Sequence, residues 1–442
     1  MSTVFALSSA PGPAGVAVVR VTGPQAGKAL RALSGKLPRP RQATLAALRR
    51  PVSGEVLDRG LVLWFPAPAS VTGEDVAELQ IHGGRAVVRA VLDALAALPG
   101  LAQAEPGDFT RRAFQNGKLD LTQVEALADL VNAETEGQRR QAQRQMDGEL
   151  GQRLERWRTE VLRALAHVEA AIDFGEDEVP PAEVLAGVAA RVHRLVPEME
   201  EALGEARRGE RLRTGVQITI VGPPNAGKSS LLNAIAGRDA AIVSSRAGTT
   251  RDVVEVHLDL AGVPVTLADT AGLREACDEI EGEGIRRAVA RSEQADVRVA
   301  VFDAADWPAL DERTLATAGP DAMVVVNKVD TRLVPDRTPS GRPVWPVSAK
   351  TGAGIRTFVQ ELARHAGERA GMSEEPGLTS VRQIAAVRDC VEALRRFLSC
   401  SQELALRAED LRLAARALGR VTGRVDVEEL LDVVFRDFCI GK

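Results

Sequence analysis

Hydrophobic and polar positions alternate in short runs through the first hundred residues, which is the spacing of half-buried β-strands. Strands are predicted at residues 15–21, 60–65 and 75–81. Residues 87–98 predict a helix that Pro99-Gly100 ends. We therefore expect a compact N-terminal α+β domain over residues 1–118.

Apolar positions recur at helical spacing from residue 119, as in Leu121 and Val124, and this helical character runs on towards Asp173. Pro180-Pro181 interrupts it, and a further helix is expected up to about Arg213. The pattern then changes to short β-rich runs that alternate with helices. Strands are predicted at residues 216–221, 263–268, 298–303, 323–327 and 344–347. That alternation is typical of a doubly wound α/β domain.

Residues 367–377 have the composition of a linker, and helical periodicity resumes after them. An apolar stripe follows at Val427, Leu430, Leu431, Val434 and Phe438. The economical interpretation is one discontinuous helical domain, residues 119–213 and 372–442, interrupted by an α/β domain at 214–371. Such insertion is tolerated where the termini of the inserted domain lie close together.

The composition narrows the class of protein. The chain has 442 residues, 45% of them hydrophobic, and a formal net charge of −5, which argues against a protein that coats nucleic acid. The four cysteines form no Cys-x-x-Cys pair, which fits a reducing cytoplasm. We see no secretory signal and no apolar run that could span a bilayer, so a cytoplasmic protein without a membrane partner is expected.

A phosphate-binding loop opens the α/β domain. Gly222 to Ser229 fits the pattern G-x-x-x-x-G-K-[ST], directly after a predicted strand and before a predicted helix. Lys228 would bring positive charge to the β and γ phosphates, and the Ser229 hydroxyl would bind Mg²⁺. The predicted nucleotide contacts in this loop are Asn225, Ala226, Gly227, Lys228, Ser229 and Ser230.

Three further motifs follow in the order that GTPases use. Asp269 to Gly272 would place a carboxylate near the metal and a backbone N–H near the γ-phosphate. Asn327-Lys328-Val329-Asp330 would recognise guanine, because a carboxylate accepts from N1–H and the exocyclic amine, which adenine lacks in that arrangement. Ser348-Ala349-Lys350 would support the guanine oxygen. The predicted contacts are Asp269, Thr270, Ala271, Gly272, Asn327, Lys328, Asp330, Ser348, Ala349 and Lys350. We therefore expect a multidomain α/β chain whose inserted domain is a Ras-like, doubly wound P-loop G domain.

The segment between the P-loop and Asp269 contains Gly248-Thr249-Thr250-Arg251-Asp252. Spacing and a resemblance to the TRAFAC-class GTPases assign Thr250 to Mg²⁺. The predicted contacts are Ser244, Ser245, Arg246, Ala247, Gly248, Thr249 and Thr250. Leu273 lies close to the position where Ras-like GTPases carry a water-orienting glutamine. Because a leucine side chain cannot orient water, hydrolysis needs another group for that role.

Four segments narrow the family: residues 72–84, residues 106–121, Gly248 to Asp252 and the terminal Phe438-Cys439-Ile440-Gly441-Lys442. Together they resemble the MnmE (TrmE) family of tRNA modification GTPases, over essentially the whole chain. The resemblance implies a homodimer that works with a flavin-dependent MnmG-type subunit, as a heterotetramer, on tRNA. The pair would add an aminomethyl or carboxymethylaminomethyl group to carbon 5 of the wobble uridine, with 5-formyltetrahydrofolate or a related tetrahydrofolate bound by the N-terminal domain.

The resemblance also implies roles for individual residues. Potassium would be bound at Asn225, Ser244, Arg246 and Thr249, and would replace an arginine finger. Ser244 and Arg246 differ from the residues expected in common homologues. Glu281 would act beside Lys228 and Thr250 as a catalytic residue, or else is a solvated carboxylate at a helix start. Folate contacts are implied for Arg20, Glu78, Lys118 and Lys442, and Cys439 is either a nucleophile or a packing residue.

A GTP-dependent ribosome-assembly or translation switch is the main alternative, and a GTP-dependent dimer scaffold is another. Assembly factors usually append a K-homology domain or a second G domain. We find no K-homology Gly-x-x-Gly loop after residue 350 and no second P-loop. The Arg20, Glu78 and Lys118 set favours a small-molecule pocket over a scaffold.

Overall fold

The computed structural model describes residues 2–174, 180–237, 255–269, 295–338, 341–371, 377–399, 403–425 and 441. It divides into two compact units. Unit 1 comprises residues 1–128, 151–158 and 415–442, and unit 2 comprises residues 129–150 and 159–414.

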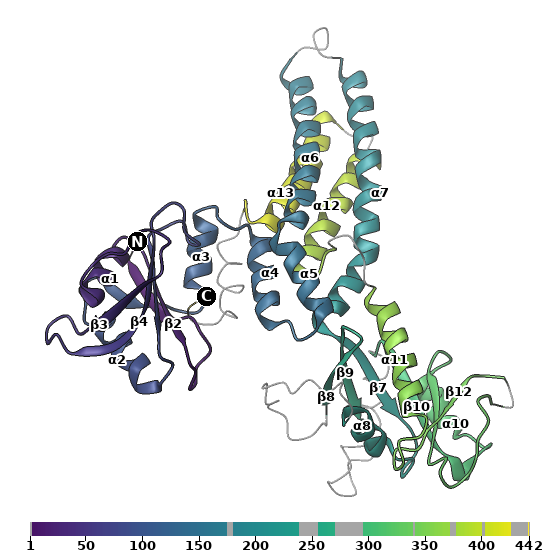
Figure 1. The fold of residues 1–442 in the computed structure, drawn as a ribbon. Coiled ribbons are helices and arrows are strands. Elements are labelled where there is room, and N and C mark those ends of the chain that lie inside the picture. The colour runs from purple at the N-terminus through teal and green to yellow at the C-terminus, as the bar shows by residue number, and fades with distance from the viewer. Residues whose placement is uncertain are drawn as a thin grey trace, which may run out of the picture. The chain divides into compact units, whose positions relative to one another are not determined.

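Unit 1 is built on a six-stranded mixed sheet with the order β3-β4-β5-β2-β1-β6 (Figure 1). Its strands are β1 (Thr3–Leu7), β2 (Ala17–Thr22), β3 (Thr44–Arg49), β4 (Val56–Phe65), β5 (Val76–Ile81) and β6 (Leu101–Gln103). The strands predicted at 15–21, 60–65 and 75–81 are confirmed as β2, β4 and β5. β1 and β6 pair in parallel, and the other pairs are antiparallel.

The two faces of this sheet carry different side chains because successive residues of a strand point to opposite faces. Helices α1 (Ala26–Ser34) and α2 (Arg85–Ala96) cover the face formed by Val19, Val21 and Leu79. Helix α3 (Asp108–Gln115) supplies Phe109 to a small cluster on the other face with Val4 and Ala6. Arg20 and Glu78 lie between the helix-facing residues of their strands, so they project from the second face.

The region expected to be helical from residue 119 to Asp173 forms three helices. They are α4 (Leu121–Asn132), α5 (Glu136–Met146) and α6 (Glu149–Asp173). A capping box starts α5, since Thr135 Oγ1 accepts from Gln138 N and Gln138 Oε1 accepts from Thr135 N. Gly148, with φ of 84°, separates α5 from α6. Local capping chemistry therefore divides a continuous apolar pattern.

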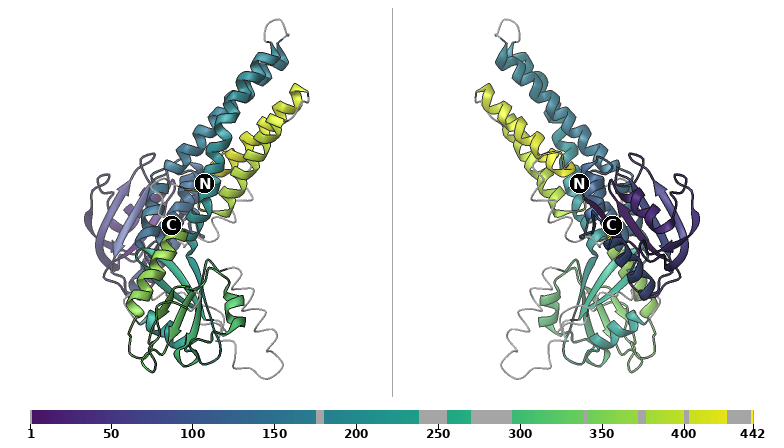
Figure 2. Two further views of the ribbon diagram at one scale, coloured as in Figure 1. Left: turned by 90° about the vertical axis from the view of Figure 1, so that its right-hand side faces the viewer. Right: turned by 90° about the vertical axis from the view of Figure 1, so that its left-hand side faces the viewer.

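Three further helices of the helical part lie within the described residues: α7 (Pro181–Thr214), α12 (Val381–Ser399) and α13 (Leu404–Thr422). Within unit 2, α7 lies beside α6 and α12 (Figures 1 and 2). Arg191 of α7 bonds Glu160 of α6 at 2.8 Å, and Met199 of α7 meets buried Cys390 of α12. No helix in the described part of the chain is both long and apolar enough to cross a membrane.

The second sheet lies between α7 and α12 in the chain and has the order β12-β11-β10-β7-β9-β8. Its strands are β7 (Val216–Val221), β8 (Glu255–Leu260), β9 (Val263–Asp269), β10 (Val297–Asp303), β11 (Met323–Asn327) and β12 (Val344–Pro346). All pairs are parallel except the β8–β9 hairpin. Each strand predicted in this region is confirmed, and β8, which we did not predict, extends the sheet.

Helices cover both faces of this sheet, as a doubly wound domain requires. Among the residues that the structure describes, they are α8 (Lys228–Ala236), α10 (Glu312–Ala318) and α11 (Ile355–Ala370), with a short 3-10 turn at Ala304–Asp306. Leu231 of α8 and Phe358 of α11 join one core cluster, whereas Ala318 of α10 joins the cluster on the opposite face.

The interpretation of residues 367–377 as a linker is wrong at its start, because α11 continues to Ala370. Ala366 and Ala370 are buried against the sheet, and this packing keeps the last turn helical in spite of Gly367. The stripe predicted from Val427 to Phe438 lies outside the described residues.

Candidate functional site

The phosphate-binding loop connects β7 to α8, as its motif predicts. Gly227 adopts a left-handed conformation, with φ of 86°, immediately before Lys228 begins the helix. A Cβ atom at Gly227 would lie 2.3 Å from Asn327 Nδ2, so only glycine fits. The buried Lys228 donates from Nζ to the carbonyls of Gly222 and Pro223, at 2.9 and 2.8 Å. The loop thus places an ammonium group beside the N-terminus of a helix, which suits an anion such as phosphate.

Asn327 connects the phosphate-binding loop to the base-recognition loops. Its Nδ2 donates to Ala226 O at 3.1 Å and to Gly227 O at 3.4 Å. Its Oδ1 accepts from Lys328 N at 2.8 Å and from Ala349 N at 3.0 Å. The side chain is 1% exposed, so one amide satisfies backbone groups of three predicted motifs where water has no access.

Lys328 lies against the same loop. Its Nζ donates to Asn225 O at 2.7 Å and to Asp303 Oδ2 at 2.6 Å. Burial raises the pKa of Asp303, but hydrogen bonds from Ala305 N and Lys328 outweigh burial and leave that pKa below its ordinary value. Asp303 was not predicted as a site residue from the sequence. Its position at the end of β10, beside β11, could have indicated it, because ends of neighbouring parallel strands meet at one sheet edge.

Asp330 and Ser348, which belong to the two motifs predicted to recognise guanine, are joined by a hydrogen bond. Ser348 Oγ donates to Asp330 Oδ1 at 2.5 Å, and this bond is the main reason that the pKa of Asp330 lies below its ordinary value. Ser348 is fully buried and also accepts from Thr351 N at 3.1 Å. The exposed carboxylate of Asp330 is therefore held by a rigid partner, in the ionised form that can accept two hydrogen bonds.

Several predicted residues cannot be placed. Ser244 to Thr250, Thr270 to Gly272, Glu281 and Lys442 lie outside the described residues, as does the side chain of Asp269. The backbone of Asp269 ends β9 opposite Ile220 of β7. Ser229 and Ser230 are exposed in the first turn of α8.

A second candidate site lies in unit 1, on the sheet face that α1 and α2 leave uncovered. Arg20 of β2 and Glu78 of β5 are directly opposite each other in the strand register. Arg20 Nε and Nη2 both donate to Glu78 Oε1, at 3.0 and 2.8 Å. The Arg20 guanidinium also lies 5.9 Å from the ring centroid of Phe109. Aromatic and β-strand neighbours therefore hold this ion pair in place.

Arg20, Glu78 and Lys118 line one cleft of about 380 Å³. The structure thus brings together three of the four residues that the family resemblance assigned to folate. Arg41 and Phe65 line the same cleft, with the guanidinium 5.7 Å from the ring centroid. Neither was singled out from the sequence, because no motif there marks them.

The loop that precedes β5 borders this cleft, and hydrogen bonds to little-exposed side chains hold it in place. Glu74 accepts from Arg112 Nη1 at 2.8 Å and from Thr22 Oγ1 at 3.2 Å, and all three side chains have little exposure. Asn116 Nδ2 donates to Thr72 O at 2.8 Å. These bonds explain part of the 72–84 and 106–121 motifs, whose polar residues fix the cleft wall.

The C-terminal end of the chain also belongs to unit 1. Ser8 Oγ donates to Gly441 O at 2.8 Å, just beyond β1. Gly441 has φ of 93°, and a Cβ atom there would lie 2.3 Å from Leu7 O. Only glycine allows so close an approach. Leu7 pairs with Val19, the neighbour of Arg20, so the penultimate residue lies near the strands that carry the ion pair.

Comparisons with known proteins cover the whole chain. The family described as the GTP-binding protein TrmE N-terminus matches residues 3–118, and the MnmE helical domain matches residues 121–439. Two relatives described as tRNA modification GTPase MnmE are similar over 100% of this chain. That from Parvibaculum lavamentivorans is 56% identical over 100% of its own length, and that from Paramagnetospirillum magneticum is 57% identical over 99%.

A mitochondrial 5-taurinomethyluridine tRNA synthase subunit from Danio rerio is 47% identical, over 100% of this chain and 93% of its own. Full-length identity at this level, together with family models that match residues 3–118 and 121–439, shows that the chain belongs to the MnmE (TrmE) family of tRNA modification GTPases and is a GTP hydrolase.

Proposed function

We propose that this chain is the potassium-activated GTPase subunit of a cytoplasmic two-component enzyme that modifies carbon 5 of the tRNA wobble uridine. The group installed is aminomethyl or carboxymethylaminomethyl, and the second component is a flavin-dependent MnmG-type subunit, in a heterotetramer built on a homodimer of this chain. The name of the Danio rerio relative, a synthase subunit for a 5-substituted uridine, supports this assignment. So does the pairing of a nucleotide site with a separate small-molecule cleft in one chain.

The Arg20–Glu78 cleft carries the proposal, because GTP hydrolysis alone needs no such site. A tetrahydrofolate such as the 5-formyl derivative has a pterin ring with donor groups and a glutamate tail with carboxylates. Glu78 can accept hydrogen bonds from the pterin ring. Arg20, Arg41 and Lys118 can form ion pairs with the carboxylates of the glutamate tail. Phe65 offers an aromatic face beside Arg41. When bound, the folate supplies a one-carbon unit.

The docked position of Gly441 supports a role for the chain terminus in this cleft. Gly441 lies beside the end of β1, which pairs with the β2 strand that carries Arg20, and Lys442 follows it in the sequence. We infer that the cleft is completed by the C-terminus of the same chain.

For the nucleotide site we propose the contacts given by the motifs, from Asn225 to Lys350. Lys228 and the α8 N-terminus bind phosphate, Ser229 and Thr250 ligate Mg²⁺, and Asp330 selects guanine. Potassium, held by Asn225, Ser244, Arg246 and Thr249, supplies the positive charge that an arginine finger supplies elsewhere. Glu281 positions the attacking water. The proposed domains are residues 1–118, the discontinuous 119–213 with 372–442, and 214–371.

A tRNA nucleoside profile tests the proposal. Cells that lack this protein should lose the 5-substituted wobble uridine, and the wild-type gene should restore it. A normal profile combined with a defect in ribosomal subunits would instead favour the assembly-factor alternative.

Calorimetry with purified protein tests the cleft. Glu78→Ala should weaken 5-formyltetrahydrofolate binding by about 1 to 3 kcal/mol, the range for losing a charged hydrogen-bond partner. Glu55→Ala is the matched control, because Glu55 forms an exposed pair with Arg50 in the same unit. Equal affinity in wild type and the Glu78 variant would show that the cleft is not the folate site.

A further inference from the structure

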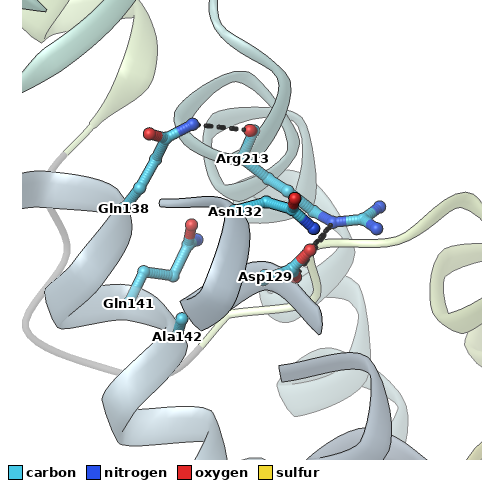
Figure 3. Close-up of a pocket in the computed structure, with 6 residues that line it drawn as sticks. All are labelled: Asp129, Asn132, Gln138, Gln141, Ala142 and Arg213. Atoms are coloured by element: carbon cyan, nitrogen blue, oxygen red, sulfur yellow. Dashed lines mark hydrogen bonds and ion pairs between the residues drawn. The ribbon is translucent and has the colours of Figure 1, made fainter. Parts of the chain in front are cut away.

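The chain passes from the helical part into the P-loop sheet at the end of α7 and returns just before α12. One face of helix α5 forms hydrogen bonds to both of these segments. Gln138, Gln141 and Gln145 are spaced three and four residues apart, so they lie on the same face; we call them the glutamine row. Gln138 Nε2 donates to Arg213 O at 3.0 Å (Figure 3). Gln141 Nε2 donates to Gly209 O at 3.2 Å. Both carbonyls belong to the last turns of α7, which leads into β7.

The third member of the row binds the returning connection. Gln145 Nε2 donates to Gly377 O at 3.2 Å and to Thr379 Oγ1 at 3.0 Å, directly before α12. Gln145 is 1% exposed, so this contact is shielded from water. The outgoing and returning segments are thus fixed to one short helix.

The first turn of α5 touches the P-loop sheet itself. Gly137 N donates to Gly262 O at 3.0 Å, in the turn between β8 and β9. A Cβ atom at Gly137 would lie 2.4 Å from Gly262 O and 3.0 Å from Leu212 Cδ1. The turn is held from its other side, because Gly262 N donates to Asp259 Oδ1 at 2.6 Å. α5 and the β8–β9 turn therefore meet backbone to backbone, with no space for a side chain.

The β8–β9 hairpin connects the two segments that sense the nucleotide. β8 begins at Glu255, shortly after the Gly248–Asp252 segment, and β9 ends at Asp269, which opens the Asp269–Gly272 motif. In GTPases these two segments change with the γ-phosphate and its metal. A displacement at either end of the hairpin would therefore reach the turn that α5 contacts.

Ion pairs fix the end of α7 to its neighbours on two sides. Arg213 Nε bonds both carboxylate oxygens of Asp129 in α4, at 2.8 and 2.9 Å (Figure 3). Arg211 bonds Asp296, just before β10, at 2.6 Å. The end of α7 thus moves with its neighbours rather than as a hinge of its own.

We propose that α5 is the coupling element between the nucleotide state of the G domain and the helical domain. The Gly137–Gly262 contact transmits movement of the β8–β9 hairpin to α5, and the glutamine row transmits it to α7 and α12. Gly137 and Gln138 are positioning residues, far in the chain from the P-loop. The inference rests on the nucleotide site proposed above.

Hydrogen exchange of the full-length wild-type protein tests the coupling. Amide exchange in residues 136–146 should differ at least about fivefold between GDP and a non-hydrolysable GTP analogue, the lower end of typical coupling energies. Exchange in α8 reports the nucleotide site, and both nucleotides should slow it. If α8 is protected and α5 exchanges equally in both states, the coupling is refuted while the site stands. If neither nucleotide protects α8, the nucleotide site itself fails, and the coupling with it.

Gly137→Ala provides the second measurement, with Gly204→Ala of α7 as its control, since a Cβ atom at Gly204 meets nothing within 4 Å. Gly137→Ala should keep the KM and kcat for GTP within about twofold, abolish the nucleotide-dependent difference in α5, and lower wobble-uridine modification in cells about tenfold or more. Gly204→Ala should leave the GTPase kinetics, the nucleotide-dependent difference in α5 and the level of wobble-uridine modification unchanged. A Gly137→Ala variant that loses heat stability but keeps the nucleotide-dependent difference in α5 would show a packing role only and overturn the proposal.

Discussion

Replacing Asn327 by alanine should weaken the whole nucleotide site rather than change its base preference. The buried amide makes four hydrogen bonds, three of them at 3.1 Å or shorter. Each buried bond contributes about 1 kcal/mol net, and partners left unpaired cost at least as much. The loss should therefore be about 3 kcal/mol or more. All four hydrogen bonds exist without nucleotide, so their removal should lower the stability of the P-loop sheet even when no nucleotide is bound.

Hydrogen exchange gives that stability locally, which matters because a chain of several domains does not unfold in one step. A loss of about 3 kcal/mol corresponds to exchange about a hundredfold faster in β7, β10 and β11, where opening of the sheet controls exchange. β2 and β5 of unit 1 are the internal control and should be unaffected. The affinities for GTP and xanthosine triphosphate should fall by similar factors. Exchange in β11 within about threefold of wild type would refute the assignment of Asn327 as the connecting group.

Asp330→Asn should weaken GTP binding and admit xanthosine triphosphate, because the amide presents a donor where the carboxylate accepted; a variant that still prefers GTP contradicts the assignment. GTP turnover should be much faster in potassium than in sodium, which is too small for the same ligands, and Asn225→Ala should remove that difference in a phosphate-release assay. Burial raises the pKa of Cys390 to about 12, against 9.0 when unburied. Above pH 9 the unfolded chain therefore loses this proton first, and stability should fall by about 1.4 kcal/mol per pH unit towards pH 12. The urea midpoint of wild type relative to that of Cys390→Ala should therefore be constant below pH 8 and should fall at pH 10.

The strands of both sheets were predictable where apolar periodicity and loop motifs coincide, as in β7 followed by Gly222. β8 was missed, although Val256, Leu258 and Leu260 alternate and Gly262 follows them as a turn signal. The ends of α5 depend on capping by Thr135 and Gln138, and α11 runs past Gly367 because of tertiary packing.

In the candidate sites, too, some residues were predictable from sequence motifs and others were not. Motifs identify Lys228 and Asp330 because the chemistry of phosphate and guanine restricts residue type and spacing. Asp303, Arg41 and Gly137 act through partners distant in sequence, and nothing near them in the chain shows which groups they meet. Such residues become visible only once the fold brings the partners together.

Unit 1 is assembled from the two ends of the chain, since residues 415–442 join residues 1–128 and Gly441 contacts Ser8. During synthesis the P-loop sheet emerges with all its strands consecutive, so it can fold while translation continues. The N-terminal sheet is available even earlier, but its contact with Gly441 forms only after the whole P-loop sheet has been made, because Gly441 lies 433 positions after Ser8. Unit 1 therefore starts to fold before the P-loop sheet and finishes after it.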